Sequence, residues 1–241
     1  MSIDIPGLQP ALLQQLQGKL KLPAYDPSAT GIGIVHIGPG AFFRAHQAWY
    51  TDLALKYGGD WGISVVSMRS NDLAKALTPQ QGLYSLVLLD KTTEYQVVGS
   101  IRELLVAAEQ YEQVLQRLAA PTSFYVTLTI TEKGYCLNAL GELDLTHADI
   151  QHDLETNVKA RSAIGLLVQA LALRFAANVP PFVVLSCDNL TDNGHKLRNA
   201  LLTFARQKQP ALANWLEQQL LSPCTMVDSI TPATDDALPK Q

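Results

Sequence analysis

The feature that most constrains this sequence is a series of short apolar runs that alternate with longer helix-compatible segments. The runs are apolar nearly throughout, which is typical of parallel strands that are buried on both faces. They occupy residues 31–37, 61–68, 123–131 and 181–189. Helix-compatible segments follow at residues 41–57, 71–77, 110–120, 162–178, 193–208 and 210–221. This alternation predicts an α/β fold with a largely parallel, doubly wound sheet.

Two segments modify the simple alternation. Residues 82–90 and 94–101 are strand candidates that are joined by the short segment KTT, and they predict an antiparallel excursion from the main sheet. Residues 7–20 predict a short amphipathic helix, which two following prolines separate from the first strand. Ser162 is a suitable N-cap for the most apolar helix of the chain.

The composition limits the partners of this chain. It has 241 residues with 47% hydrophobic content and a net charge of −4, so it carries no basic field for a nucleic-acid backbone. No apolar run approaches the roughly 20 residues that span a bilayer. The N-terminal residues lack the basic cluster and apolar core of a secretory signal. We therefore expect a soluble cytoplasmic protein that binds neither nucleic acid nor a membrane.

The cysteines and histidines show no spacing typical of a metal site. Cys136, Cys187 and Cys224 are far apart, and we expect them to be reduced, small hydrophobic residues of the core. The five histidines lack an H-x-x-x-H pair, so we predict no metal. His36 lies inside the first apolar run and is expected to be a buried core histidine. The acidic segment 142–155 is expected to be a solvated loop.

The turn after the first run carries two glycines in the pattern Gly-x-Gly. In a dinucleotide-binding βαβ unit, the first glycine permits the tight turn and the second lets the backbone approach the pyrophosphate. Gly38 and Gly40 occupy these two positions, whereas the place of the usual third glycine is taken by Phe43. Arg44 follows and could reach a phosphate. The pattern is common, so a strand-to-helix bend without a ligand is the alternative interpretation.

The end of the second apolar run leaves the choice of nucleotide open. An acidic residue at this place binds the ribose 2′-hydroxyl of NAD, whereas an arginine accommodates the 2′-phosphate of NADP. Arg69 stands at the tip of the run, and Asp72 comes only three residues later. The residues alone therefore favour neither cofactor.

Five blocks in a fixed order give a more specific indication. They are GPGAFFRAHQAWYTD (38–52), LTITEKGYC (128–136), SAIGLLVQAL (162–171), LSCDNLTDNG (185–194) and PCTMVDSITPAT (223–234). Together they resemble the polyol-specific long-chain dehydrogenases, a family that includes mannitol 2-dehydrogenases and fructuronate reductases (D-mannonate oxidoreductases). The second and fifth blocks are closer to the fructuronate reductases. The resemblance extends from about residue 31 to residue 234.

The resemblance implies a Rossmann-like domain that binds NAD and takes part in hydride transfer to or from a sugar-derived alcohol or ketone. It implies that the substrate is held by Asn189 and that Asp228 lies close to the active site. Family members usually have an arginine after this aspartate, where the present chain has Ser229. The cofactor-binding residues that we expect are Ile37, Gly38, Pro39, Gly40, Ala41, Phe42, Phe43, Arg44, Arg69, Thr131, Glu132 and Lys133.

The family takes up the substrate proton with a lysine in the helical pattern Lys-x-x-x-x-Asn-x-x-His. Lys133 is followed by Asn138 at the required spacing, but Gly141 stands where the histidine belongs. In the family this pattern lies in a C-terminal helical domain. The resemblance therefore implies that the present chain is the cofactor-binding half, with a separate chain as one possible source of the lysine.

We accordingly expect three parts. Residues 1–30 are a helix and lead-in, residues 31–225 are the Rossmann-like domain, and residues 226–241 begin the linker to a helical domain. The expected function is the cofactor-binding half of an oxidoreductase that acts on a hexuronate or hexitol, with fructuronate and mannonate favoured. The alternatives are mannitol and fructose as substrates, or a non-catalytic fragment or pseudoenzyme that only binds NAD.

Overall fold

The computed structural model describes residues 7–18, 20–227 and 229–232. Its centre is a five-stranded sheet with the strand order β5–β2–β1–β6–β7, and each neighbouring pair in it is parallel. The strands are β1 (Ile32–Ile37), β2 (Gly62–Ser67), β5 (Ile101–Val106), β6 (Tyr125–Leu128) and β7 (Val183–Ser186). From β1 the chain builds the sheet first in one direction and then, after β5, in the other, which is the Rossmann arrangement. The predicted α/β fold is confirmed.

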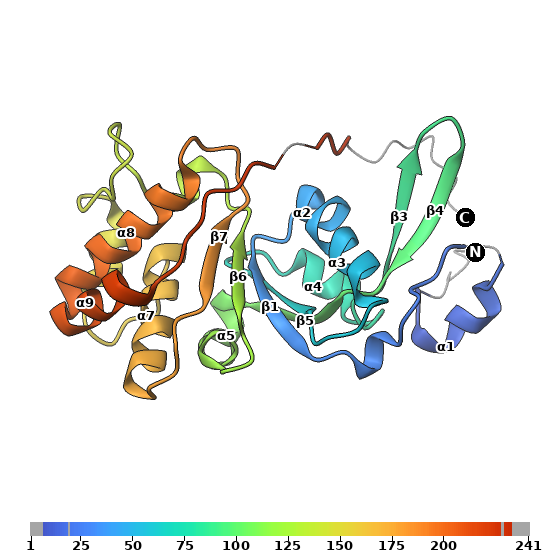
Figure 1. Cartoon of the computed structure of the whole chain (residues 1–241), viewed down its shortest axis with the longest axis horizontal. Helices are drawn as coiled ribbons and strands as arrows, with labels where there is room; N and C mark the ends of the chain where they lie inside the picture. The colour runs from blue at the N-terminus through green and yellow to red at the C-terminus, as the bar shows by residue number, and fades with distance from the viewer. Residues whose placement is uncertain (1–6, 19, 228, 233–241) are drawn as a thin grey trace.

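Helices cover both faces of this sheet (Figure 1). One face carries α2 (Ala41–Ala45), α3 (Gln47–Leu55) and α4 (Asp72–Leu77), and the other carries α5 (Ala107–Ala119), α7 (Ala163–Ala176) and α8 (Asn193–Lys208), with α9 (Pro210–Gln219) against α8. Successive residues of a strand point to opposite faces. Val65 accordingly packs in the cluster with Phe43, whereas Val66 packs in the cluster with α5 and α7. The strands are apolar throughout because both of their faces are buried.

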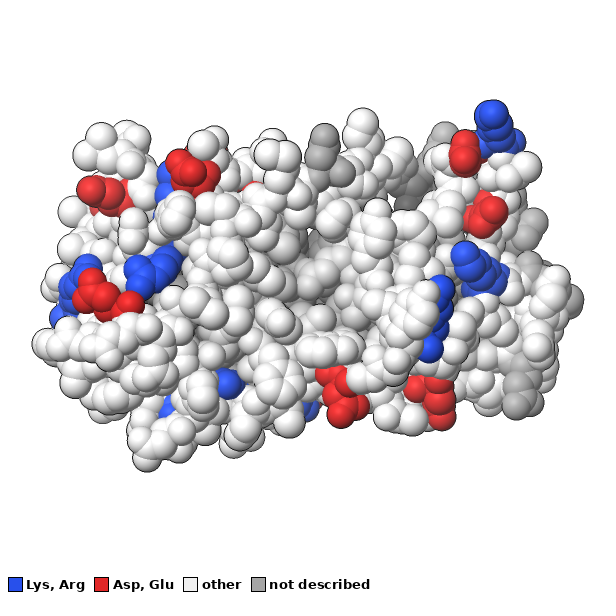
Figure 2. All heavy atoms as spheres, viewed as in Figure 1, with Lys and Arg blue, Asp and Glu red and all other residues white. Residues whose placement is uncertain are grey.

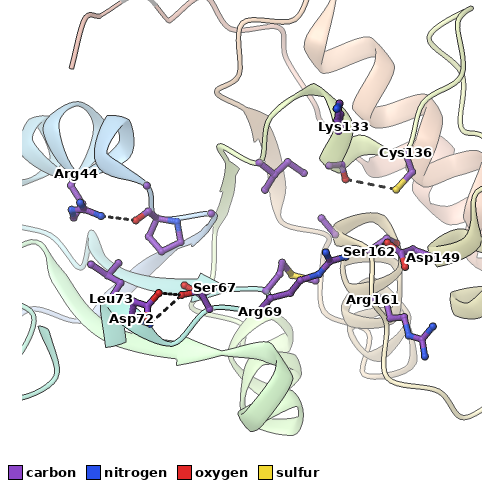
Figure 3. A pocket seen from close by; sticks show the side chains of 18 of the residues that line it. Arg44, Ser67, Arg69, Asp72, Leu73, Lys133, Cys136, Asp149, Arg161 and Ser162 are labelled. Atoms are coloured by element: carbon purple, nitrogen blue, oxygen red, sulfur yellow. Dashed lines mark hydrogen bonds and ion pairs between the residues drawn. The ribbon is translucent and has the colours of Figure 1, made fainter. Parts of the chain in front are cut away.

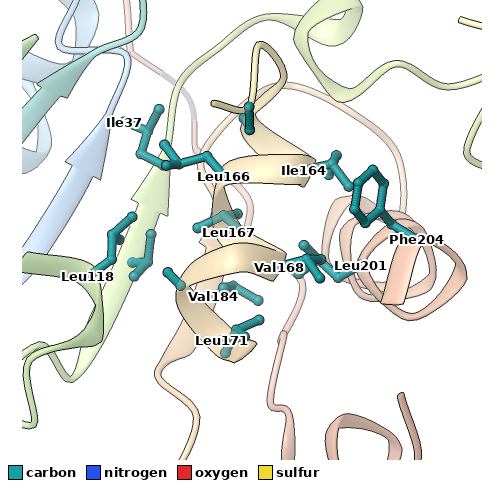
Figure 4. Close-up of a cluster of buried hydrophobic side chains, with 14 of the residues drawn as sticks. Ile37, Leu118, Ile164, Leu166, Leu167, Val168, Leu171, Val184, Leu201 and Phe204 are labelled. Carbon is teal, nitrogen blue, oxygen red and sulfur yellow. The ribbon is translucent and has the colours of Figure 1, made fainter. Parts of the chain in front are cut away.

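Helix α7 is buried around most of its surface because it lies between the sheet and α8. Figure 4 shows Leu166 beside Ile37 of β1, and Val168 beside Leu201 of α8. Residues of β1, α7 and α8 all belong to one continuous core. The N-terminus of α7 is capped as predicted, since Ser162 Oγ accepts a hydrogen bond from the Gly165 N–H at 2.9 Å.

The antiparallel excursion is also confirmed. Strands β3 (Tyr84–Leu89) and β4 (Thr93–Val98) form a separate two-stranded sheet, in which Tyr84 pairs with Val98. The remaining short helices are α1 (Pro10–Leu13), α6 (Ala148–Leu154) and 3₁₀ turns at Gln14–Leu16, Pro27–Ala29 and Glu132–Tyr135. Among the described residues, no helix combines the length and apolar character that a membrane span requires.

Several local predictions are wrong. The helix expected over residues 7–20 is reduced to α1 and one 3₁₀ turn, and the helix over 41–57 is interrupted at His46, which has φ −119° and ψ −92°. Strand β5 was not predicted. The acidic segment 142–155 is not simply a solvated loop, since it contains α6 and the fully buried Asp153. Cys136 is buried as expected, but Cys224 is exposed.

Candidate functional site

A cleft of about 920 Å³ opens at the carboxyl ends of β1, β2 and β6 (Figure 3). This is the edge where open α/β sheets bind ligands, at the point where the chain reverses the direction in which it adds strands. The floor is the turn 38–40 that follows β1. One wall is built by residues 67–73, and the other by residues 130–136 together with residues of the α6–α7 region.

Gly38 is required by the protein itself. It has φ +90°, and a Cβ atom at this position would overlap the carbonyl oxygen of Thr129. The Gly38 N–H donates to the Val66 carbonyl at 3.0 Å, and the Gly38 carbonyl accepts from the Thr129 hydroxyl at 2.7 Å. The turn is therefore fixed between β2 and β6, and only glycine fits its first position.

Gly40 is different, because the protein does not need a glycine there. Its φ of −71° and ψ of −177° are open to any residue. A Cβ atom would find only the Gly38 carbonyl oxygen, at 4.0 Å, so it would extend into open space. Gly40 also lines the cleft. Neither the conformation nor the packing of the protein explains a glycine at this position. A ligand that approaches the backbone closely would explain it, because a side chain would be in its way.

The remaining residues of the predicted phosphate-binding segment divide into two groups. Pro39 and Arg44 line the cleft with the two glycines, and the Arg44 guanidinium donates to the Pro39 carbonyl at 2.9 Å. Four others lie away from the lining: Ile37 and Phe43 are fully buried, Phe42 stacks on His46 and Ala41 is exposed. Phe43 was expected to be one of the cofactor-binding residues, but its ring packs inside the protein.

The wall at the end of β2 carries an ion pair. The Arg69 guanidinium lies 3.3 Å from the carboxylate of Asp149, which belongs to the first turn of α6. Both residues line the cleft, and Figure 3 shows them reaching across it. Asp72 also lies on this wall, where its carboxylate accepts a hydrogen bond from Ser70 at 2.8 Å. Asp149 was not among the residues predicted from the sequence, because it lies in the segment that was expected to be a loop.

The charge of the lining differs from that of the whole chain. On the face shown in Figure 2, acidic and basic side chains are interspersed. Four cationic and two acidic residues line the cleft, although the chain has a net charge of −4. The cations are Arg44, Arg69, Lys133 and Arg161, and the carboxylates are Asp72 and Asp149. A local excess of positive charge favours an anionic ligand such as a diphosphate.

The α6–α7 region is held by a buried carboxylate. Asp153 accepts hydrogen bonds from the backbone N–H groups of Arg161 at 2.7 Å and Ser162 at 2.9 Å, and from the Ser162 hydroxyl at 2.6 Å. A Cβ atom on Gly165 would overlap this carboxylate. The arrangement fixes residues 161–163, which line the cleft.

The opposite wall follows β6 and is conformationally strained. Thr131 has φ +66° and ψ 160°, a combination that is nearly restricted to glycine and costs on the order of 1–3 kcal/mol. Cys136 at the other end of this segment is left-handed, with φ +53°. The carboxylate of Asp188 accepts from the N–H groups of Ile130 at 2.9 Å and Thr131 at 3.1 Å, and from the Tyr135 hydroxyl at 2.7 Å.

Burial and the neighbouring Asp188 raise the pKa of the Tyr135 phenol well above its ordinary value, so this hydroxyl is a neutral donor. Lys133 lines the cleft, whereas Thr131 and Glu132 are outside its lining. Asn189 is exposed next to Asp188, and Asp228 lies outside the described residues. Asp188 was not singled out from the sequence, although its place directly after a buried strand was a usable signal.

Comparison with known protein families also indicates a dinucleotide-binding domain. A family model described as the mannitol dehydrogenase Rossmann domain matches residues 32–240. This chain belongs to the mannitol dehydrogenase family. The resemblance predicted from the five sequence blocks is thereby confirmed.

Two curated relatives of this mannitol dehydrogenase domain illustrate the range of the family. D-mannonate oxidoreductase of Escherichia coli strain K12 is 44% identical over 218 residues, which cover 88% of the chain and 45% of the relative. Polyol:NADP oxidoreductase of Gluconobacter oxydans is 37% identical over 236 residues, which cover 95% of the chain and 49% of the relative. The chain thus spans about half the length of the curated relatives it matches.

A solved structure extends the likeness of the mannitol dehydrogenase domain to three dimensions. It is the ternary complex of Pseudomonas fluorescens mannitol 2-dehydrogenase with NAD and D-mannitol. The two chains are 41% identical and superimpose with a TM-score of 0.89, over 95% of this chain and 48% of the other.

Proposed function

We propose that this chain is the cofactor domain of an NAD-dependent oxidoreductase that acts on sugar acids or polyols. The observation that carries the proposal is Gly40, which lines the cleft and has open space where its side chain would be. Neither the backbone conformation nor the packing at this position requires glycine, which supports a close approach of a ligand to the backbone there.

The residues of the cleft fit a dinucleotide. The diphosphate would lie over Gly38 and Gly40, with Arg44 and the other lining cations supplying positive charge. The adenosine would extend toward the end of β2, where Arg69 and Asp72 line the wall. The nicotinamide would extend toward residues 130–136. When bound, the nicotinamide ring supplies the hydride acceptor or donor of the reaction.

NAD is the favoured cofactor because Asp149 already neutralises Arg69, the residue that would otherwise attract a 2′-phosphate. The solved relative is a complex with NAD, which supports this choice. Another relative is a polyol:NADP oxidoreductase, so binding of NADPH is to be tested beside binding of NADH.

Fructuronate and mannonate are the substrate pair that we favour. One of the relatives of 44% identity is a D-mannonate oxidoreductase, and the TEKGYC and CTMVD blocks resemble that branch of the family. Mannitol and fructose are the second candidates, since the solved relative binds D-mannitol. Asn189 is the residue that we propose to hold the substrate, with Asp228 close by. The lysine pattern to which the family resemblance assigns proton uptake is not complete anywhere in these 241 residues.

Isothermal titration of the folded chain with NADH tests the proposal. We expect saturable binding that Gly40→Val weakens about tenfold or more, since the added side chain fills the space above the turn. Ala211→Val, on the exposed side of α9, introduces the same valine side chain far from the cleft and should leave binding unchanged. Circular dichroism and thermal unfolding show whether each variant remains folded.

Two results contradict the proposal. One is the absence of NADH and NADPH binding by folded wild-type protein at millimolar concentration. The other is wild-type affinity in folded Gly40→Val. Steady-state assays of the whole protein with fructuronate, fructose and mannitol then distinguish the substrate candidates.

A further inference from the structure

We propose that Asp188 is a positioning residue, which holds segment 130–136 in place and thereby sets where the nicotinamide half of the cofactor binds. This inference rests on the proposed function, since it assigns a role to one end of the same cleft. Asp188 is not among the residues that line the cleft, so it acts through the segment that it holds.

The carboxylate of Asp188 holds both ends of the strained turn. Its two oxygens accept the backbone N–H groups of Ile130 and Thr131 at the start of the segment. One of the same oxygens accepts the hydroxyl of Tyr135 near the end. Tyr135 is fully buried, and its hydroxyl also contacts Ser186 Oγ at 2.6 Å. The Asp188 side chain therefore connects the start of the segment to its end. At the start, Thr131 has a backbone conformation that threonine rarely adopts.

The position of Asp188 is itself fixed by a second set of contacts. The side-chain amide of Asn193 donates to the backbone carbonyls of Ser186 and Asp188, at 3.2 Å in both cases, and to the carbonyl of Thr225 at 3.0 Å. These contacts involve the backbone of Asp188 and leave its carboxylate free for the segment. A change confined to the carboxylate should consequently release residues 130–136 without unfolding the end of β7.

Segment 130–136 forms only one end of the cleft. Ile130, Lys133, Gly134 and Cys136 line that end, beyond the carboxyl end of β6. The adenosine half of a dinucleotide lies on the β2 side, because the ribose is recognised at the end of β2. Movement of the segment should therefore affect the nicotinamide half of the ligand and leave the adenosine half in place.

Parallel titrations with NADH and ADP-ribose test this inference, because ADP-ribose lacks the nicotinamide ring. In Asp188→Asn and Tyr135→Phe, we expect NADH affinity to fall about tenfold, toward that of ADP-ribose, while ADP-ribose affinity stays within about twofold of wild type. The fluorescence of bound NADH, which reports on the surroundings of the nicotinamide, should move toward that of free NADH. A purely structural role would weaken both ligands together.

Asp192→Asn is the matched control, since it makes the same substitution at an exposed residue nearby, with no side-chain capping bond. It should change neither affinity. The inference is overturned if folded Asp188→Asn keeps the wild-type ratio of NADH to ADP-ribose affinity, whether or not both affinities fall. It is also overturned if neither variant folds. Failure of the wild-type chain to bind either ligand would instead overturn the proposed function.

Discussion

The ring of Phe43 lies flat on the imidazole of His36, with the ring centroids 3.6 Å apart and the planes inclined by 11°. Both side chains are fully buried. This stack occupies the contact between the first strand and the following helix, where the usual third glycine permits close packing. The departure from the glycine pattern thus changes the packing behind the turn and leaves Gly38 and Gly40 in the cleft.

The buried His36 predicts a loss of stability in acid. Desolvation lowers the pKa of His36 from 6.5 to about 3, and its ring is held by Thr127 and Thr129 at 2.8 and 3.0 Å. Below pH 6.5 the unfolded chain binds a proton that the folded chain does not. The contribution is therefore fully present above pH 6.5 and declines as the pH falls toward 3. Between pH 7 and pH 5 we expect a loss of about 2 kcal/mol from this residue.

Urea unfolding at the two pH values measures this effect. Other groups also titrate, so the difference between variants is the informative quantity. His36→Gln should lose about 2 kcal/mol less than the wild type between pH 7 and pH 5. His195→Gln alters an exposed histidine and should behave like the wild type. Equal acid losses in the wild type and His36→Gln would show that His36 is not the group responsible.

The two glycines of the turn should respond differently to alanine. Gly38→Ala is expected to cost about 3 kcal/mol of unfolding free energy, because alanine must adopt φ +90° and its Cβ overlaps the Thr129 carbonyl. Gly40→Ala should change stability by less than about 1 kcal/mol, since its backbone conformation and surroundings accept a Cβ. Denaturant unfolding of both variants tests the contrast. Similar losses would mean that Gly40 has a structural role after all.

Much of the fold was predictable because its central strands and helix α7 are buried on both sides. Such elements are apolar throughout and carry a clear signal, as β1 and β2 do. Strand β5 was missed because Arg102 and Glu103 interrupt its apolar residues and because α5 begins directly at Ala107 without a turn. The glycine turn was predictable from local geometry, since Gly38 and Gly40 are neighbours in the chain.

The walls of the cleft were less predictable, because they depend on contacts between distant residues. Asp153 looks like a surface acid in the sequence, yet it is buried against the start of α7. Asp188 acts on Ile130 and Thr131, more than fifty residues earlier in the chain. Spacing within one segment carries no information about such partners. The resemblance to a family drew attention to Asn189 but not to its neighbour.

Removal of the Asp149 charge, which pairs with Arg69, is expected to change the cofactor preference. The Arg69 side chain is 79% exposed, so the pair contributes little to stability. Asp149 nevertheless competes with any phosphate for Arg69. Asp149→Asn should therefore raise the affinity for NADPH relative to NADH by about threefold or more, since an arginine at the end of β2 accommodates a 2′-phosphate.

Competitive titration with the two reduced nucleotides measures the ratio. Glu155→Gln removes the same charge at an exposed site just beyond the other end of α6 and is the control. Adding Arg69→Gln to Asp149→Asn should reverse the gain. An unchanged ratio in Asp149→Asn would show that Arg69 does not meet the adenosine end of the cofactor.

Replacement of the buried Arg174 is expected to destabilise the protein outside the cleft. It is 3% exposed, and its guanidinium donates to the carbonyls of Pro180 at 2.7 Å and Ala120 at 2.8 Å, with further bonds to Leu118 and Ser123. These contacts tie the end of α5 to the segments that enter β6 and β7. Arg174→Met keeps much of the side-chain volume but leaves several buried carbonyls without donors. We expect a loss of about 3 kcal/mol, measured by urea unfolding.

A lysine at the same position distinguishes charge from geometry. Arg174→Lys restores a positive charge, but one ammonium group cannot reach carbonyls that are distributed around a planar guanidinium, so we expect only partial recovery. Arg206→Met is the control, because Arg206 is half exposed and pairs with Glu217 at 3.2 Å, and it should cost no more than about 1 kcal/mol. If Arg174→Met cost as little as this control, the four carbonyls must find other donors, and the connection between α5 and the strands would not depend on Arg174.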